Sequence, residues 1–326
     1  MNIEDLKPAD ILVFSGEKGS LVSEIIMLLT GAPVSHAAMV FREPQEIVEE
    51  TPPAVAVHKA VERFQGRKIY VNRLVSGPTD IGPVLDAAQS YVNEEEPYAM
   101  SNLYLVGLLL VYQRFTPNTL TKRVMIRILK KLTAKILHRI HEHETPGKQP
   151  MVCSQFVYQC FEDAGGPYHL DLRDALLAMR PLMVSAEGGP ASEDESTLDR
   201  VMRRVEEEGS PQLEERLLRA SVQPASTAPD ESEEELLAEL RDALQSVEAP
   251  VSPEPEDDVI AVISRFAQAV HATHPESGPE VRLMATRGGV SLPALRFLHS
   301  QQAVFVTPAD LLDGCKNLTR IGTIDI

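Results

Sequence analysis

The sequence predicts an α+β fold, with an antiparallel sheet built from the first quarter of the chain and helices after it. Four short segments have the apolar or alternating pattern of strands: residues 10–14, 36–41, 46–50 and 68–74. Three longer segments that follow have the length and spacing of helices: residues 84–94, 101–115 and 151–164. The chain has 326 residues, enough for one large domain with an insertion or for two ordinary domains.

Turn residues separate the predicted strands from one another. The strand DILVF at 10–14 runs into a Ser-Gly turn, and a short helix over 21–29 stops near the Gly-Ala-Pro sequence that follows it. The segment HAAMVF at 36–41 is apolar, and EIVEE at 46–50 ends at Thr-Pro-Pro. The segment KIYVNRL at 68–74 alternates apolar and polar residues, which is typical of a half-buried strand.

Two segments beyond residue 100 leave a membrane interpretation open. Residues 103–112 are apolar throughout, but a spanning helix needs about 20 such residues, so a buried core helix is predicted. Residues 120–143 have an amphipathic pattern with basic polar faces, and no acid occurs between Glu96 and Glu142. Such a helix can lie on an anionic membrane surface. The alternative is a solvated helix docked on the core, or on the acidic segment of the same chain.

Acidity is confined to one part of the chain. The net charge is −17, and residues 187–258 alone contribute −16 of it. Residues 186–257 are rich in Glu, Ser, Pro and Ala, a composition that buries too little apolar surface to offset the entropy of ordering. They are therefore predicted to be a mostly disordered insertion, with helix-prone pieces near 196–220 and 232–247.

The C-terminal part regains the pattern of an ordered protein. An amphipathic helix is predicted over 259–272, a strand over 303–306, and a short helix that opens at the TPADL sequence of 307–311, before the segment 318–324. This pattern predicts three parts: a core over 1–185, the acidic insertion over 186–257, and a C-terminal segment over 258–326 that completes the core.

Composition excludes several classes of function. Trp is absent and aromatic residues make up 5% of the chain, so nucleic-acid binding through a base-stacking platform is not predicted. The three cysteines form no CxxC pair and no zinc-type cluster, so neither disulfides nor a metal or other cofactor is predicted. The acidic, polar N-terminus lacks the pattern of a signal peptide. A cytoplasmic protein is predicted, with peripheral membrane attachment or export without a cleaved signal as alternatives, and its oligomeric state stays open.

Cys153 is the candidate nucleophile. It stands at the start of the predicted helix 151–164, where free N–H groups and a partial positive charge stabilise a thiolate or an oxyanion. Cys160 lies two turns deeper on the same helix, where burial should raise its pKa, and Cys315 has no accompanying motif. Taken alone, a cysteine at a helix start is more often a packing residue than a catalytic one.

His36 and Glu49 supply the two further groups that a thiol nucleophile needs. These groups are a base within hydrogen-bond reach and a residue that fixes the tautomer of that base. His36 opens an apolar strand, and Glu49 lies on the strand that should pair beside it, so the two side chains are expected to meet. Glu50 points to the opposite face and is the weaker candidate, and His58 is the rival base.

These residues resemble the permuted NlpC-like branch of the papain-fold cysteine hydrolases, in particular the YiiX-like family. PADILVFSG is similar to the opening strand of that family, GAPVSHAAMV to its histidine strand, IVEE to its glutamate strand, and CSQFVYQCFEDAG to its cysteine helix. EEPYAM and TPADL are weaker matches. The sequence departs from the pattern where Pro8-Ala9-Asp10 replaces the usual Gly-Asp, and where about 140 residues separate the cysteine helix from TPADL.

The resemblance implies a circularly permuted papain-like core in which an antiparallel sheet packs against the cysteine helix. It also implies hydrolysis of an amide or ester bond through an acyl-thioester, with Cys153 as nucleophile, His36 as base and Glu49 orienting the histidine. The expected substrate is an acyl-containing small molecule, lipid or peptide. Ser154 and Tyr98 are further candidates for substrate or oxyanion contacts.

Two other classes of function stay open. The first is a membrane-surface lipid-binding protein or acyltransferase that works through residues 100–143. The second is a non-catalytic protein that binds a partner through its acidic segment.

Overall fold

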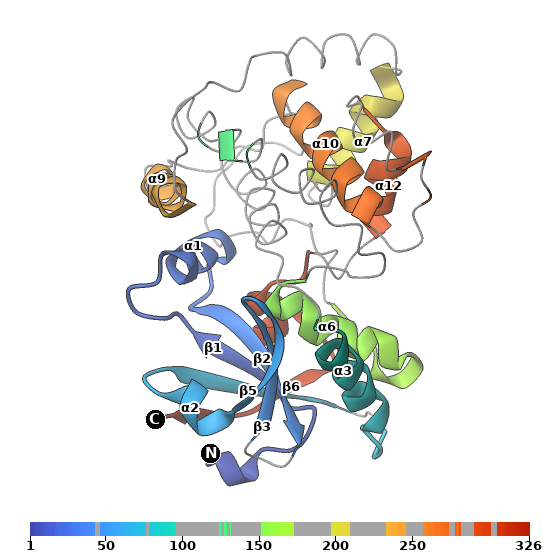
Figure 1. The fold of residues 1–326 in the computed structure, drawn as a ribbon. Coiled ribbons are helices and arrows are strands. Elements are labelled where there is room, and N and C mark those ends of the chain that lie inside the picture. The colour runs from blue at the N-terminus through green and yellow to red at the C-terminus, as the bar shows by residue number, and fades with distance from the viewer. Residues whose placement is uncertain are drawn as a thin grey trace, which may run out of the picture. The chain divides into compact units, whose positions relative to one another are not determined.

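The structure is a computed structural model, which describes the chain in several stretches: residues 1–42, 46–75, 78–95, 124, 127–128, 131, 151–172, 197–208, 233–245, 257–273, 278, 280–281, 290–300 and 305–326 (Figure 1). The chain divides into two compact units. The first comprises residues 1–103, 148–176 and 303–326, and the second comprises residues 104–147 and 177–302.

A six-stranded antiparallel sheet forms the centre of the first unit, in the order β4-β3-β2-β1-β5-β6. The strands are β1 Ile11–Ser15, β2 Val34–Arg42, β3 Glu46–Thr51, β4 Ala54–Lys59, β5 Lys68–Leu74 and β6 Leu318–Asp325. The predicted α+β class is confirmed, and each of the four strands predicted in the first quarter of the chain is present. The unpredicted strand β4 pairs with β3 across a tight Pro52-Pro53 turn, which the sequence pattern marked only as the end of β3.

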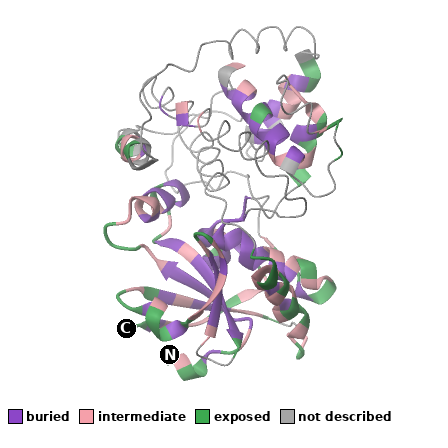
Figure 2. Ribbon diagram, in the orientation of Figure 1, coloured by how far each residue is buried: buried purple, intermediate pink, exposed green. Residues whose placement is uncertain are grey.

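Helices cover both faces of this sheet (Figure 1). They are α1 Leu21–Thr30, α2 Ala60–Phe64, α3 Gly82–Glu94 and α6 Cys153–Ala164, with 3-10 turns at Ile3–Asp5 and Gly166–Tyr168. Because side chains alternate along a strand, Val13 and Met39 face α6, whereas Leu12 and Phe14 face α2. Figure 2 shows that strands β1, β2 and β3 are largely buried, and apolar residues on both of their faces form core. The sheet thereby holds α6 and α2 at fixed positions on opposite sides.

The helix α6 ends at the predicted residue Ala164 but begins at Cys153, two residues after the predicted start at 151. Its N-cap residue Val152 is extended, and the Val152 carbonyl accepts the first helical hydrogen bond from Phe156 N at 2.8 Å. Gly165 ends the helix with a φ of 71°, a value that favours glycine. Phe156, Val157 and Phe161 are buried against the sheet, and each fully buried side chain of this size contributes about 1.5–3 kcal/mol.

The C-terminal block, residues 305–326, closes the first unit. Ser154 Oγ donates to Val306 O at 2.7 Å, and the buried Asn72 Nδ2 donates to Leu311 O at 2.6 Å and to Leu312 O at 2.8 Å. The predicted strand at 303–306 is wrong for residues 305 and 306, because the Val306 carbonyl bonds to a side chain and not to a strand. Residues 303 and 304 lie outside the described residues.

The second unit contains four described helices: α7 Thr197–Glu208, α9 Glu233–Gln245, α10 Asp257–Thr273 and α12 Leu292–Ser300. α12 packs against both α10 and α7. Buried apolar residues line these contacts, among them Val201, Ile263, Phe266, Leu295 and Leu298. The prediction placed 258–302 with the core, whereas the structure groups these residues with α7, because the apolar sides of α10 and α12 are buried there.

The acidic segment holds ordered helices at both of the predicted helix-prone pieces. α7 lies within 196–220 and α9 lies within 232–247. Arg127, from the predicted basic helix, forms an ion pair with Glu239 of α9. This is the kind of contact that docking of the basic helix on the acidic segment predicts.

The remaining membrane-related predictions fall mostly outside the described residues. These include the whole of 101–115 and all of 120–143 except the four helical residues Val124, Arg127, Ile128 and Lys131, of which Val124 and Ile128 are buried. Over the stretches that the structure does describe, no helix has both the length and the apolar character needed to cross a bilayer.

Candidate active site

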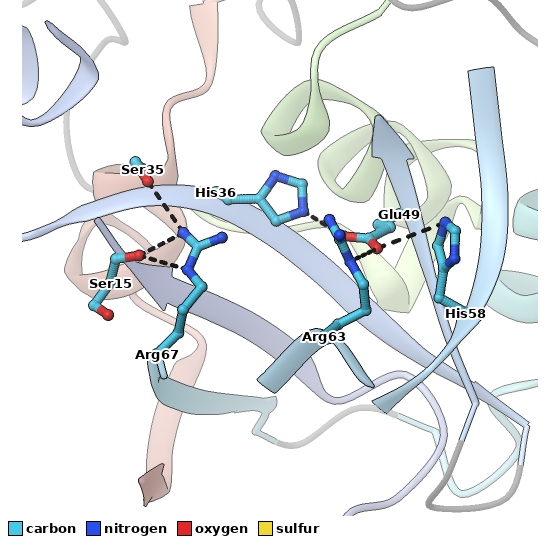
Figure 3. A network of polar contacts seen from close by, with 7 residues as sticks. All are labelled: Ser15, Ser35, His36, Glu49, His58, Arg63 and Arg67. Carbon is cyan, nitrogen blue, oxygen red and sulfur yellow. Dashed lines mark hydrogen bonds and ion pairs between the residues drawn. The ribbon is translucent and has the colours of Figure 1, made fainter. Parts of the chain in front are cut away.

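His36 and Glu49 come together because β2 and β3 are neighbours in the sheet. Met39 is paired with Val48, and this antiparallel register places His36 near the residue that follows Val48. His36 Nε2 lies 2.5 Å from Glu49 Oε2 (Figure 3). Glu49 is fully buried, whereas the His36 side chain is 13% exposed. The predicted meeting of these two side chains is thus present in the structure.

Cys153 is the first residue of α6 and is 2% exposed. Its sulfur interacts with the His36 side chain and with the backbone N–H groups of Ala37 and Ser154. Because Glu49 occupies Nε2 of His36, Nδ1 is the ring nitrogen left for the sulfur. The three predicted residues therefore form a chain of contacts in the order sulfur, imidazole, carboxylate, the arrangement that activates a thiol nucleophile.

The charges in this chain of contacts favour a thiolate and an imidazolium. Burial alone would raise the pKa of Cys153, but the charge and hydrogen bond of His36 and the two backbone N–H groups lower it below its usual value. Burial alone would lower the pKa of His36, but the charges of Cys153 and Glu49 and the hydrogen bonds to them raise it to about 9. The ion pair is therefore populated from the lowered pKa of Cys153 up to a pH of about 9.

Two further cationic or basic side chains surround Glu49 (Figure 3). Arg63 Nε lies 2.5 Å from Oε1, Arg63 Nη2 donates to Oε2 at 3.2 Å, and His58 Nε2 lies 3.8 Å from Oε1. Burial alone would raise the pKa of Glu49, but His36 and then Arg63 lower it to about 2. Glu49 consequently stays ionised at any pH at which the protein would work.

The rival candidates of the sequence occupy other places. His58 lies beside Glu49, and Glu49 separates it from His36. Glu50 is also fully buried, but alternation along β3 turns it to the opposite face of the sheet from Glu49. Burial raises the pKa of Cys160 well above its usual value, which confirms the prediction for that thiol, and Cys315 Sγ lies 3.6 Å from Asp310 O.

The two candidates for substrate contacts have different outcomes. The Ser154 hydroxyl is buried and donates to Val306 O, so it ties α6 to the C-terminal block, while the Ser154 backbone N–H interacts with the Cys153 sulfur. Tyr98 lies outside the described residues. In the part of the chain that the structure covers, no group of three His, Cys, Asp or Glu side chains is placed to hold a metal ion.

Sequence reasoning missed two arginines at this site, Arg63 on α2 and Arg67 just before β5. Neither belongs to a motif. The one sequence signal for Arg63 was indirect, because a carboxylate buried between two strands requires a compensating cation. Comparison of the chain with models of protein families and with curated proteins adds no further signal, because none of them matches.

Replacing Arg63 by glutamine is expected to raise the pKa of Glu49 from about 2 by about one unit, which should slow alkylation of Cys153 by iodoacetamide about twofold at pH 3 and leave the rate at pH 5 nearly unchanged. Without Arg63, Glu49 takes up a proton at higher pH and then stops orienting His36. The pH at which the alkylation rate begins to fall on the acidic side should therefore be higher in Arg63→Gln, and Arg63→Lys should restore part of the rate. Arg42→Gln is the matched control, because Arg42 of β2 pairs with Glu46, a partly exposed carboxylate at the start of β3. An unchanged onset of this fall in Arg63→Gln would contradict a positioning role.

Proposed function

We propose that this protein is a thiol-dependent hydrolase that cleaves an amide or ester bond of an acyl-containing, lipid-like or peptide-like substrate. The observation that carries the proposal is the contact of the Cys153 sulfur with His36, whose second ring nitrogen lies 2.5 Å from the buried Glu49. The proposal includes a circularly permuted papain-like core. It is supported by the chain order His, Glu, Cys and by the packing of α6 on an antiparallel sheet.

The first half-reaction forms an acyl-thioester. The Cys153 thiolate attacks the substrate carbonyl carbon, and the carbonyl electron pair moves onto oxygen. The oxyanion is bound by N–H groups at the start of α6, including that of Cys153, a role supported by the free N–H groups that a helix start presents. As the tetrahedral intermediate collapses, the bond to the leaving amine or alcohol breaks, and His36 gives the leaving group its proton.

The second half-reaction restores the enzyme. His36, now neutral, takes a proton from water, and the resulting hydroxide oxygen attacks the thioester carbonyl. Collapse of the second intermediate releases a carboxylic acid and returns the electron pair to sulfur, which regenerates the thiolate beside the imidazolium. Glu49 stays ionised throughout and holds the His36 ring in the orientation that both proton transfers need.

The proposal is tested by site-resolved labelling with iodoacetamide at pH 6, followed by peptide mass spectrometry. Cys153 should label faster than Cys160 and Cys315 by a factor of about a hundred or more, because its pKa is lowered, whereas burial raises the pKa of Cys160 and Cys315 is a buried thiol outside the helix α6. Equal labelling of all three cysteines, or labelling of Cys153 only after denaturation, would overturn the proposal.

A further inference from the structure

Arg67 is a cation held rigidly at the edge of the proposed active site. Its Nε donates to Ser15 O at 2.9 Å, and its Nη2 donates to the same carbonyl and to Ser35 Oγ at 3.2 Å (Figure 3). Ser35 Oγ is also 2.9 Å from Ser23 Oγ of α1. These contacts fix the plane of the guanidinium between β1 and β2.

The ring of Phe14 lies close to both Arg67 and His36. The guanidinium carbon lies 5.1 Å from the centroid of the Phe14 ring, and the His36 ring centroid lies 5.2 Å from the same point. Ser35, which accepts from Arg67, is also the residue before His36 in β2. A substrate whose acyl group lies at Cys153 and His36 would therefore have its neighbouring atoms within reach of Arg67.

No carboxylate of the described chain neutralises Arg67 by an ion pair. Glu49 is already engaged by His36 and Arg63, and Glu17 acts on Arg67 only through its charge, without a contact. Burial lowers the pKa of Arg67, so its charge is partly withdrawn from water. The nitrogen Nη1 donates to no described residue. A half-buried guanidinium with a spare donor and no paired carboxylate is a ready site for an anion.

We propose that Arg67 binds a singly charged oxyanion of the substrate, a carboxylate or a phosphodiester, close to the acyl bond that Cys153 attacks. This inference rests on the proposed function and adds a charge requirement to it. One guanidinium matches one negative charge, and its planar fork presents N–H donors to two oxygens of the same group. Neutral acyl compounds would then be poorer substrates than their anionic analogues.

The test compares two alkylating reagents that share one reactive carbon and differ in charge. Iodoacetate has a carboxylate where iodoacetamide has a neutral amide, and both are displaced at carbon by the Cys153 thiolate with loss of iodide. The measured quantity is the ratio of the two second-order rate constants at Cys153. In Arg67→Gln this ratio should fall about tenfold, and Arg67→Lys should keep part of it. Arg42→Gln, at the far end of β2, should leave the ratio unchanged.

The outcomes separate this inference from the function on which it rests. If iodoacetamide does not prefer Cys153 in the wild-type protein, the proposed function fails. If it does, and Arg67→Gln leaves the ratio unchanged or slows both reagents equally, the anion site is overturned and Arg67 only ties β1 to β2. Protection of Cys153 from iodoacetamide by acetate or by dimethyl phosphate, lost in Arg67→Gln, supports the site and tells a carboxylate ligand from a phosphodiester.

Discussion

The Cys153→Ala protein is expected to lose turnover of 4-nitrophenyl acyl esters by at least about a thousandfold, because no other group can form the covalent intermediate. The wild-type protein should release a burst of nitrophenol and gain the mass of one acyl group on the peptide that contains Cys153. Steady-state rates, burst amplitudes and intact-protein mass spectra measure the effect. The side chain is small and buried, so circular dichroism and urea unfolding should show a retained fold.

The matched controls for this experiment are the other two cysteines of the chain. Cys160→Ala and Cys315→Ala remove buried thiols that have no contact with His36, so both variants should keep the burst. A Cys153→Ala protein that still forms an acyl adduct and turns over at the wild-type rate would exclude Cys153 as the nucleophile.

Replacing His36 by alanine is expected to slow alkylation of Cys153 at pH 6 by as much as about 300-fold. The pKa of the thiol rises when the imidazolium is lost, and a free cysteine, with a pKa of about 8.5, is only about 0.3% ionised at pH 6. The wild-type rate should instead be flat from mildly acidic pH upward, because His36 lowers the pKa of Cys153. Stopped-flow or mass-spectrometric rates between pH 4 and 10 measure both profiles.

Rates measured above pH 9 distinguish two roles of the His36 imidazole: lowering the pKa of Cys153 and giving a proton to the leaving group. Above its pKa of about 9, His36 loses its proton but Cys153 remains a thiolate. Alkylation needs no proton donor, so its rate should persist above pH 9, whereas hydrolysis of an amide should decline there because the leaving amine must be protonated. His58→Ala, which removes a histidine on the other side of Glu49, is the control and should change neither profile by more than about twofold, since His58 lies 3.8 Å from Glu49 while His36 and Arg63 each approach it to 2.5 Å. Parallel decline of both rates above pH 9 would contradict this assignment.

Most strands of the first unit and the helix α6 could be predicted because short stretches of sequence specify them. Strands β1, β2, β3 and β5 show apolar or alternating patterns, and α6 has both a Pro-containing start and a Gly-Gly stop. The meeting of His36 and Glu49 followed from the pairing of two consecutive strands, which needs only a short connection. Cys153 required more, since its helix lies over a hundred residues further along, and no local pattern predicts which strand the start of that helix meets.

Other features depend on tertiary contacts that no local pattern records. Arg63 and Arg67 matter because of what they touch, and each stands in an unremarkable stretch around the short helix α2. The helix α7 was harder to place, because the acidity of the segment around it masks the apolar side that it buries, whereas α10 was predicted as a helix but not as a neighbour of α12. Composition reports the average of a segment, whereas packing depends on which side of a helix the few apolar residues occupy.

Because the ribosome makes the chain from its N-terminus, the contacts between α6 and the C-terminal block form late. A nascent chain that has already released Cys153 from the ribosome still lacks Val306, the acceptor of the adjacent Ser154 hydroxyl, and the Leu311 and Leu312 carbonyls that bind Asn72. The edge strand that covers β5 is made later still. The helix that carries Cys153 thus gains the Ser154–Val306 hydrogen bond only after residue 306 has been made, long after its own residues.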